Sequence, residues 1–369
     1  MLTINVLFLA NDAYGGRGGI AYYNRCLAEA LAEIPEIDRV TLLPRSLCDT
    51  ADKMPPKVSL IGTAAGSKTR FVRTAAAQLF RPCDAVLCGH INLLPLAAAL
   101  AFVKGVPLVL QVHGIEVWEA RHALVRAYMW ACLKIVTAVW SVSGVTRDRM
   151  NAWAKLPISD YTIIPNTIHL ERYGLAPESA DLQKRFGVEG KKVILTLARL
   201  DRRERYKGID EILECLPQLL QQAPTLAYLI AGCGDDQPRL TAKAQSLGVA
   251  DRVCFIGHVP ESDKADLLRL ADVFAMPGRG EGFGIVYLEA MACGVPVVGS
   301  LLDGSREALR NGELGQLVNP DDSACLQRAL LRALHIPKHI PAGLEHFAWS
   351  AFARRVNAAM TAILRKSAS

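Results

Sequence analysis

Short apolar runs, each about the length of a buried strand, alternate along this chain with segments of helical spacing. A strand followed by a helix, repeated many times, is typical of a mostly parallel sheet with helices on both faces. The runs form two series, 4–10, 40–43, 85–88, 108–112, 138–142 and 161–164 in the first, and 193–198, 226–231, 253–256 and 273–276 in the second. Because 369 residues are long for one hydrophobic core, the two series predict two α/β domains, each built on a doubly wound parallel sheet.

The polar stretch 171–190 separates the two series and is typical of a linker region. We therefore expect an N-terminal domain over residues 1–172 and a C-terminal domain over residues 173–346. The last segment, 347–369, carries apolar residues at helical spacing. It predicts a terminal helix that packs back on the N-terminal domain.

Composition bounds the class of protein. Hydrophobic residues make up 51% of the chain and charged residues 21%, which is typical of a globular protein with ample core. The longest apolar region, 93–112, is interrupted by Lys104, Gly105 and Pro107, so it predicts a helix and a strand rather than a membrane span. Because no basic leader or cleavage site opens the sequence, we expect a cytoplasmic protein with reduced cysteines.

The net charge of +6 is concentrated in the first half of the chain. Residues 53–83 carry six basic residues and no acidic one, and within them 69–81 mixes Arg70, Arg73 and Arg81 with apolar side chains. Two interpretations stay open for this segment: a solvated helix face, or contact with an anionic membrane surface. In the second, the protein would be peripheral on the cytoplasmic face of the inner membrane. We expect no nucleic-acid partner.

One stretch, 280–298, has the features of a ligand-binding site. Three glycines alternate with Glu281 and Phe283, and a helical pattern then runs from Ile285 to Gly294. That helix is apolar almost all round, so it should be buried, and its Glu289 costs several kcal/mol unless a partner hydrogen-bonds or neutralises it. Glycines ahead of a helix leave backbone N–H groups free for an anion. The stretch predicts a site for a phosphate that carries a hydroxyl-rich group.

Basic residues and glycines also follow the strands of the second series. Arg199 and Lys207 flank one loop at the carboxyl end of the run 193–198, where two cations suit a diphosphate. The three arginines between them fit a solvated loop better. Gly232 and Gly234 follow the next run, and His258 follows the run after that. The carboxyl ends of these strands therefore predict one ligand-binding edge.

The first series offers weaker signals. Gly16 and Gly18 follow the run 4–10, where a glycine loop approaches a ligand or simply makes a tight turn. His113 closes the run 108–112 and should lie at a carboxyl strand end, although a lone histidine is more often structural.

Glu281 and Glu289, with seven residues between them, together with Arg199, Lys207-Gly208, the pair Gly232 and Gly234 and the loop 15–19, resemble the retaining glycosyltransferases of family 4. The resemblance covers nearly the whole chain. It implies the GT-B fold, in which two Rossmann-like domains face each other across an interdomain cleft. It also implies transfer of a sugar from a nucleotide-sugar donor, held mainly by the C-terminal domain, to an acceptor held mainly by the N-terminal domain.

Carried over residue by residue, the resemblance implies that Glu289 binds the ribose hydroxyls and that Glu281 lies beside the transferred sugar. Arg199 and Lys207 would hold the diphosphate. Backbone N–H groups at the start of the helix would complete the phosphate site; they belong to Gly284, Ile285 and Val286, directly after Phe283.

The remaining contacts that the resemblance implies come from other loops. Gly16 and Gly18 would approach the phosphates from the opposite domain, and His113 would lie near the sugar. The donor would also be bordered by Gly232, Gly234 and His258. The catalytic candidates are thus Glu281, His113, Arg199 and Lys207. The sequence departs from the family where Asp303-Gly304-Ser305-Arg306-Glu307 replaces the usual paired glycines and Pro-Glu.

The chemistry predicts no metal and no cofactor. Loss of a nucleoside diphosphate requires stabilisation of the negative charge that grows on the phosphate, and many transferases use a metal bound by Asp-x-Asp. No two aspartates of this sequence have that spacing. Arg199, Lys207 and a helix N-terminus can supply the same electrostatic stabilisation. Retention of the anomeric configuration is expected from the family.

The leading hypothesis is therefore a hexosyltransferase that uses a UDP-, GDP- or ADP-sugar and a glycan acceptor, which the family suggests is lipid-linked. A nucleotide-sugar epimerase or hydrolase on the same fold is one alternative. A non-catalytic nucleotide-sugar binding protein is another, and charges at both the phosphate and the sugar argue against it. The base, the sugar, the acceptor and the linkage stay open.

Overall fold

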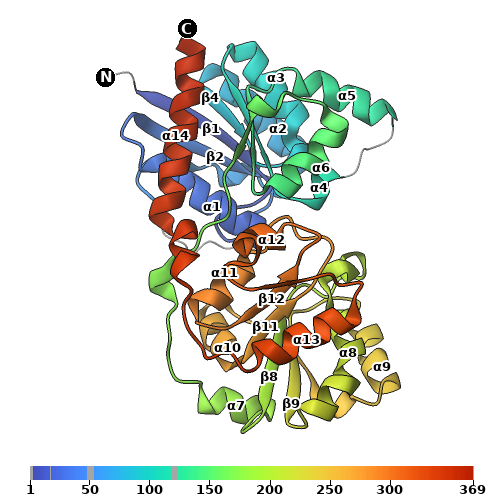
Figure 1. Cartoon of the computed structure of the whole chain (residues 1–369). Coiled ribbons are helices and arrows are strands. Elements are labelled where there is room, and N and C mark those ends of the chain that lie inside the picture. The colour runs from blue at the N-terminus through green and yellow to red at the C-terminus, as the bar shows by residue number, and fades with distance from the viewer. Residues whose placement is uncertain (1–2, 17, 48–53, 119–122, 369) are drawn as a thin grey trace. The chain divides into compact units, whose positions relative to one another are not determined.

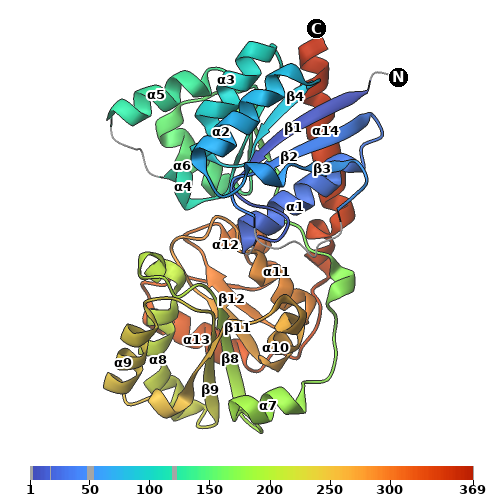
Figure 2. The same ribbon diagram turned by 180° about the vertical axis from the view of Figure 1, so that it is seen from behind.

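Two parallel sheets organise the protein, one in each of two compact units (Figures 1 and 2). The first unit comprises residues 1–167 and 349–369, and the second comprises residues 168–348. The structure, a computed structural model, describes residues 3–16, 18–47, 54–118 and 123–368.

The first unit is built on seven parallel strands in the order β3-β2-β1-β4-β5-β6-β7. They are β1 (Ile4–Ala10), β2 (Ile37–Pro44), β3 (Val58–Leu60), β4 (Ala85–Cys88), β5 (Leu108–Val112), β6 (Ala138–Ser141) and β7 (Tyr161–Ile163). The order of strands reverses between β1 and β4. In an open α/β sheet such a reversal opens a crevice at the carboxyl ends of the strands, where ligands bind.

Helices cover both faces of this sheet (Figures 1 and 2). They are α1 (Gly19–Ala32), α2 (Lys68–Ala77), α3 (Leu94–Lys104), α4 (Ile115–Trp118), α5 (Ala123–Leu133), α6 (Gly144–Ala154) and α14 (Trp349–Ala368). The terminal helix α14 packs against α1, where the Trp349 indole donates to Glu33 Oε1 at 3.1 Å and Phe352 meets Tyr23 edge-on. Sequence-distant segments at the two ends of the chain thus share one core.

The second unit repeats the arrangement with six parallel strands in the order β10-β9-β8-β11-β12-β13. They are β8 (Lys192–Leu197), β9 (Leu226–Ala231), β10 (Val253–Gly257), β11 (Val273–Met276), β12 (Val297–Ser300) and β13 (Gln316–Val318). The helices are α7 (Ala180–Phe186), α8 (Ile209–Gln222), α9 (Gln237–Ser246), α10 (Lys264–Leu270), α11 (Ile285–Ala292), α12 (Ser305–Ala308) and α13 (Ser323–Ala333). Here the order reverses between β8 and β11.

The predicted doubly wound α/β sheets are confirmed, and each apolar run of the sequence forms a strand close to its expected limits. Two strands carry no signal in the sequence, β3 and β13. Each has three residues and lies at the edge of its sheet, as does β7, which was predicted from its apolar run. The stretch interpreted as a linker contains α7, whose N-terminus is capped by the Ser179 hydroxyl. None of the helices in the described residues is long and apolar enough to cross a membrane.

Candidate active site

The reversal of strand order in the second unit brings together the loops that follow β8 and β11. These loops touch backbone to backbone because glycines stand at the contacts. A Cβ atom on Gly208 would lie 2.6 Å from the Pro277 carbonyl oxygen, and one on Gly278 would lie 2.6 Å from the Tyr206 carbonyl oxygen. The Arg279 amide donates to that same Tyr206 oxygen at 2.8 Å. Any side chain at either glycine would push the two loops apart.

Four charged side chains meet where these loops join. Lys207 Nζ forms an ion pair with Glu281 Oε1 and lies 3.8 Å from Glu204 Oε2, and Arg199 pairs with Glu204 Oε1. The side chains of Lys207 and Glu281 are only 15% and 12% exposed, whereas that of Arg199 is 77% exposed. The structure thus brings together Arg199, Lys207 and Glu281, which the sequence had placed in one site.

The electrostatics keep Lys207 positively charged. Burial, the largest single influence, lowers the pKa of this ammonium, but the charges of Glu281, Tyr206 and Glu204 and the hydrogen bond to Glu281 together outweigh burial and raise the pKa above its ordinary value. Within this cluster the two cations, Lys207 and Arg199, are balanced by the two carboxylates, Glu281 and Glu204. An anionic group can bind here by pairing with the two cations in place of their carboxylate partners.

The helix α11 begins directly after this cluster. Gly284 precedes its first residue with a φ of 85°, and a Cβ there would lie 2.3 Å from the ring of Tyr287. Ile285 and Val286 form the first turn of α11, and Phe283 is buried with its ring against Phe347. The phosphate contacts expected of these backbone N–H groups stay a prediction.

Glu289 is buried in α11, and two side chains that the sequence did not point to satisfy it. Its Oε1 accepts hydrogen bonds from Lys264 Nζ at 2.5 Å and from the Tyr173 hydroxyl at 3.1 Å. The sequence predicted that Glu289 needs a neutralising partner. In this structure that partner is Lys264 of the same unit. The contact with ribose hydroxyls stays a prediction.

The loop after β9 packs on the loop after β8. A Cβ on Gly232 would lie 1.8 Å from the Ala198 carbonyl oxygen, and one on Gly234 would lie 2.0 Å from that of Leu200. Only glycine fits at either position, because any side chain would meet the backbone of the neighbouring loop. The role of Gly232 and Gly234 in donor binding stays a prediction. His258 directly follows β10 and is exposed. The carbonyl of the preceding residue, Gly257, accepts a hydrogen bond from the Gly232 amide at 2.8 Å.

The three arginines of the charged loop are exposed, as the solvated interpretation requires, and each pairs with an aspartate. The ion pairs are Arg202 with Asp235 at 2.6 Å, Arg203 with Asp201 at 3.1 Å and Arg205 with Asp236 at 2.8 Å. Two of these aspartates follow Gly234, so the ion pairs fasten the loop after β8 to the loop after β9.

In the first unit, His113 directly follows β5, the strand beside β4, and is neutral. Its Nε2 is 3.1 Å from the Gly89 carbonyl oxygen after β4, and its ring meets Tyr23 edge-on with ring centroids 5.3 Å apart. Burial lowers the pKa of His113 to about 4. Gly18 has a φ of 89° and open space where a Cβ would stand, whereas a Cβ on Gly16 would lie 2.9 Å from the side chains of Asp12 and Ala21.

Two family models match the chain in succession. The model described as Glycosyltransferase Family 4 matches residues 17–172, and the model described as Glycosyl transferases group 1 matches residues 178–342. This chain belongs to the glycosyltransferases of family 4. The family resemblance of the motifs is thereby confirmed.

Curated relatives are named mannosyltransferases. One is a phosphatidyl-myo-inositol mannosyltransferase of Mycobacterium leprae (strain TN), 37% identical over 54% of this chain and 52% of the relative. Another is a GDP-mannose-dependent alpha-(1-6)-phosphatidylinositol monomannoside mannosyltransferase of Mycolicibacterium smegmatis, 33% identical over 64% of this chain and 63% of the relative. The chain spans less than two thirds of the length of these relatives.

Solved structures of similar fold align along almost the whole chain. Anabaena Alr3699/HepE in complex with UDP matches with a TM-score of 0.78 and 20% identity, over 97% of this chain and 100% of that chain. A sucrose-phosphate synthase from Thermosynechococcus elongatus matches with a TM-score of 0.77 and 21% identity, over 98% and 100%. At this level of identity the likeness shows the fold, which is the predicted GT-B fold.

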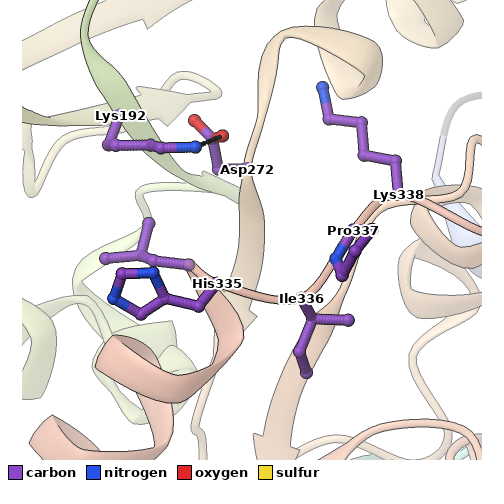
Figure 3. A pocket seen from close by; sticks show the side chains of 7 residues that line it. Lys192, Asp272, His335, Ile336, Pro337 and Lys338 are labelled. Atoms are coloured by element: carbon purple, nitrogen blue, oxygen red, sulfur yellow. Dashed lines mark hydrogen bonds and ion pairs between the residues drawn. The ribbon is translucent and has the colours of Figure 1, made fainter.

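Figure 3 shows a hollow of about 300 Å³ in the second unit. Lys192, the first residue of β8, pairs there with Asp272, which directly precedes β11, at 2.8 Å. The hollow is therefore at the amino edge of the sheet, opposite the edge that carries Lys207 and Glu281. No residue predicted for the active site lines it.

Sequence reasoning missed Glu204, Lys264, Tyr173 and Asp303. Glu204 had a signal, because it is an acid placed among arginines between two predicted cations. Lys264 and Tyr173 had none, since they reach Glu289 from 25 and 116 residues away. In the described residues no group of three or more His, Cys, Asp or Glu side chains is placed to hold a metal ion.

Proposed function

We propose that this protein is a hexosyltransferase that moves a sugar from a nucleotide-sugar donor to a glycan or glycolipid acceptor. The observation that carries the proposal is the partly buried pair of Lys207 and Glu281 at the strand reversal of the second unit, with Arg199 and Glu204 beside it. A cation held at the carboxyl edge of a doubly wound sheet suits a diphosphate. Family membership supports the same reaction class.

In this proposal, Lys207 and Arg199 neutralise the charge that grows on the leaving diphosphate. Preorganised charges of this kind cost no reorganisation during the reaction, and the loss of one donor typically slows turnover by about a hundredfold or more. Glu281 would lie beside the transferred sugar, and Glu289 would use its remaining oxygen for the ribose. In this proposal the enzyme also needs no metal and retains the anomeric configuration of the transferred sugar.

For the donor, we propose a nucleoside diphosphate hexose with GDP-mannose as the first candidate. The curated relatives support this choice, since one is named as GDP-mannose-dependent. They also support a lipid-linked acceptor, because both are named for phosphatidylinositol or its mannoside.

The first unit has a surface suited to such an acceptor's membrane. On α2 and the turn after it, Lys68, Arg70, Arg73 and Arg81 are exposed, and Phe80 between them is 91% exposed. Lys104 Nζ donates to the carbonyl oxygens of Leu79 and Arg81, so the exposed Phe102 and Val103 at the end of α3 lie near this turn. Apolar side chains surrounded by cations favour an anionic lipid surface. Phe71, which the sequence grouped with them, is instead buried in the core.

The reaction is tested with UDP-, GDP- and ADP-sugars. A donor that binds the folded state raises the melting temperature by mass action, and we expect one nucleotide class to do so clearly. That donor is then incubated with membrane lipid extract, and the product's anomeric proton is examined by NMR. Turnover of the donor without acceptor would favour an epimerase or hydrolase, and binding without any turnover would favour a non-catalytic protein. An inverted anomeric centre would exclude retention.

Membrane contact is tested by flotation with vesicles that contain anionic lipid. We expect Phe80→Ser to reduce the bound fraction several-fold. Leu175→Ser is the matched control, because Leu175 is an exposed apolar residue of the second unit. Equal binding by both variants would remove the membrane from the proposal.

A further inference from the structure

The peptide at Glu281 is held on both sides by residues 303–305, which lie between β12 and α12. The Glu281 amide donates to Asp303 Oδ2 at 2.9 Å, and the Glu281 carbonyl accepts from the Gly304 amide at 2.8 Å. A Cβ on Gly304 would lie 2.0 Å from the Gly282 carbonyl oxygen. The two segments therefore touch backbone to backbone, and the position of Glu281 depends on residues 303 and 304.

Asp303 is fully buried, and its second oxygen is also occupied. Oδ1 accepts from the Ser305 amide at 3.0 Å and from the Ser305 hydroxyl at 2.6 Å. The Ser305 hydroxyl lies 2.9 Å from that of Tyr287, which in turn donates to the Met276 carbonyl at the end of β11. One hydrogen-bonded network thus joins the end of β11, the first turns of α11 and the loop after β12.

Among the described residues no cation forms an ion pair with Asp303. A buried carboxylate without a cation is costly unless hydrogen bonds satisfy it, and here three donors from two segments do so. Only a carboxylate offers two acceptor oxygens for this arrangement. An asparagine would present its amide hydrogens to either Glu281 or Ser305, where a donor already stands.

We propose that Asp303 is a positioning residue that fixes the backbone at Glu281, and so places the Glu281 carboxylate against Lys207 for reaction. The proposal rests on the proposed function and deepens it. Asp303 acts through Glu281 and not on the substrate. Asp303, Gly304 and Ser305, which lie in the stretch where this sequence departs from its family's usual pattern, thereby acquire a role in the active site.

The variants are Asp303→Asn, Ser305→Ala and, as a matched control in the same segment, Arg306→Ala, whose side chain is exposed. Asp303→Asn should lower kcat by tens-fold, because small displacements of a reacting group cost up to about a hundredfold. Affinity for the nucleoside diphosphate should change less than threefold, since Arg199 and Lys207 remain. Ser305→Ala, which removes one of the three donors, should have an intermediate effect, and Arg306→Ala should match the wild type.

Amide hydrogen exchange of the peptide that spans residues 277–284 gives a readout that does not depend on activity. Asp303→Asn should speed exchange at the Glu281 amide at least tenfold, and Arg306→Ala should not. An unchanged exchange rate, an unchanged kcat, or a loss of nucleotide affinity as large as the loss of kcat would overturn the proposal. If Asp303→Asn does not fold, Ser305→Ala provides both readouts. A wild type that transfers no sugar while its Glu281 amide responds to Asp303→Asn would refute the proposed function and leave the positioning contact standing.

Discussion

The two units share one order over their first six strands, yet the loops at the carboxyl edges of their sheets differ in chemistry. In the first unit the loop after β1 carries the open glycine Gly18, and the loop after β5 carries a buried neutral histidine, His113. In the second unit the loops after β8 and β11 carry two cations and two carboxylates around Lys207 and Glu281. The comparison teaches that topology places a site at the carboxyl edge of the sheet, while the loop side chains decide what the site binds.

The glycines of the two units differ in the same way. Gly232 and Gly234 of the second unit pack against the carbonyl oxygens of the neighbouring loop, so their missing side chains make room for protein. Gly18 of the first unit faces open space, so no packing contact requires its missing side chain, whereas its φ of 89° does. The loops of the second unit are thus held by partly buried ion pairs and close backbone packing. The loops of the first unit carry neutral groups and leave open space at Gly18.

The largest expected effect on stability comes from removing buried charge in the second unit. Glu289→Ala leaves the largely buried Lys264 with only the exposed Glu261 as an acidic partner. Breaking a buried ion pair costs about 3 to 5 kcal/mol of unfolding free energy, and we expect the lower end of that range here. Urea denaturation measures the change. The control Glu214→Ala, which removes an exposed partner of Lys243, should cost about 1 kcal/mol or less. Equal losses in both variants would mean that the Glu289 pair is no more important than a surface pair.

Lys207→Ala should have an effect of similar size, on turnover. Loss of this charge should lower kcat by about a hundredfold to a thousandfold, which corresponds to about 3 to 4 kcal/mol of transition-state stabilisation. Lys192→Ala is the matched control, because Lys192 pairs with Asp272 at the opposite edge of the same sheet. Steady-state kinetics with the donor that raises the melting temperature decide the matter, and a normal kcat in Lys207→Ala would refute the assignment.

Asp303 predicts a pH dependence of stability. Burial and the negative charge of Glu281 raise the pKa of Asp303 to about 6 from 3.8, although hydrogen bonds from Ser305 and Glu281 oppose the shift. The folded state therefore binds the proton more tightly than the unfolded state. The contribution to stability is full below pH 3.8 and is lost as the pH rises through 6, a change of about 3 kcal/mol.

The measurement is urea unfolding from pH 4.5 to pH 7.5 for the wild type and for Asp303→Asn. The difference between the two should fall with rising pH, and the asparagine variant should lack this part of the dependence. A difference that stays constant over the range would show that the carboxyl does not titrate there.

The sequence predicted more of the second site than of the first. Apolar runs and the glycines and cations after them identified both sheets and placed Arg199, Lys207 and Glu281 on one edge. The residues that complete the site were not predicted because they make long-range contacts. Lys264 reaches Glu289 from another helix, and Asp303 reaches Glu281 from the loop after the neighbouring strand β12. Periodicity reports which face of an element is buried, and it carries no information about which side chain meets another.

The smallest effect is expected at Gly18, and it tests the comparison most directly. Gly18 has a φ of 89° and a ψ of 175°, a region that only glycine adopts readily, so Gly18→Ala should cost about 1 to 3 kcal/mol of stability without a clash. Gly105→Ala is the control, because Gly105 also has a positive φ of 66° and open space, but ends α3 on the other side of the sheet. Both variants should fold, as urea denaturation would show. If the space at Gly18 serves a phosphate, calorimetry should find weaker nucleotide-sugar binding in Gly18→Ala alone. Equal binding in both variants would mean that Gly18 serves only the start of α1, and the first unit would then contribute nothing to the donor through this loop.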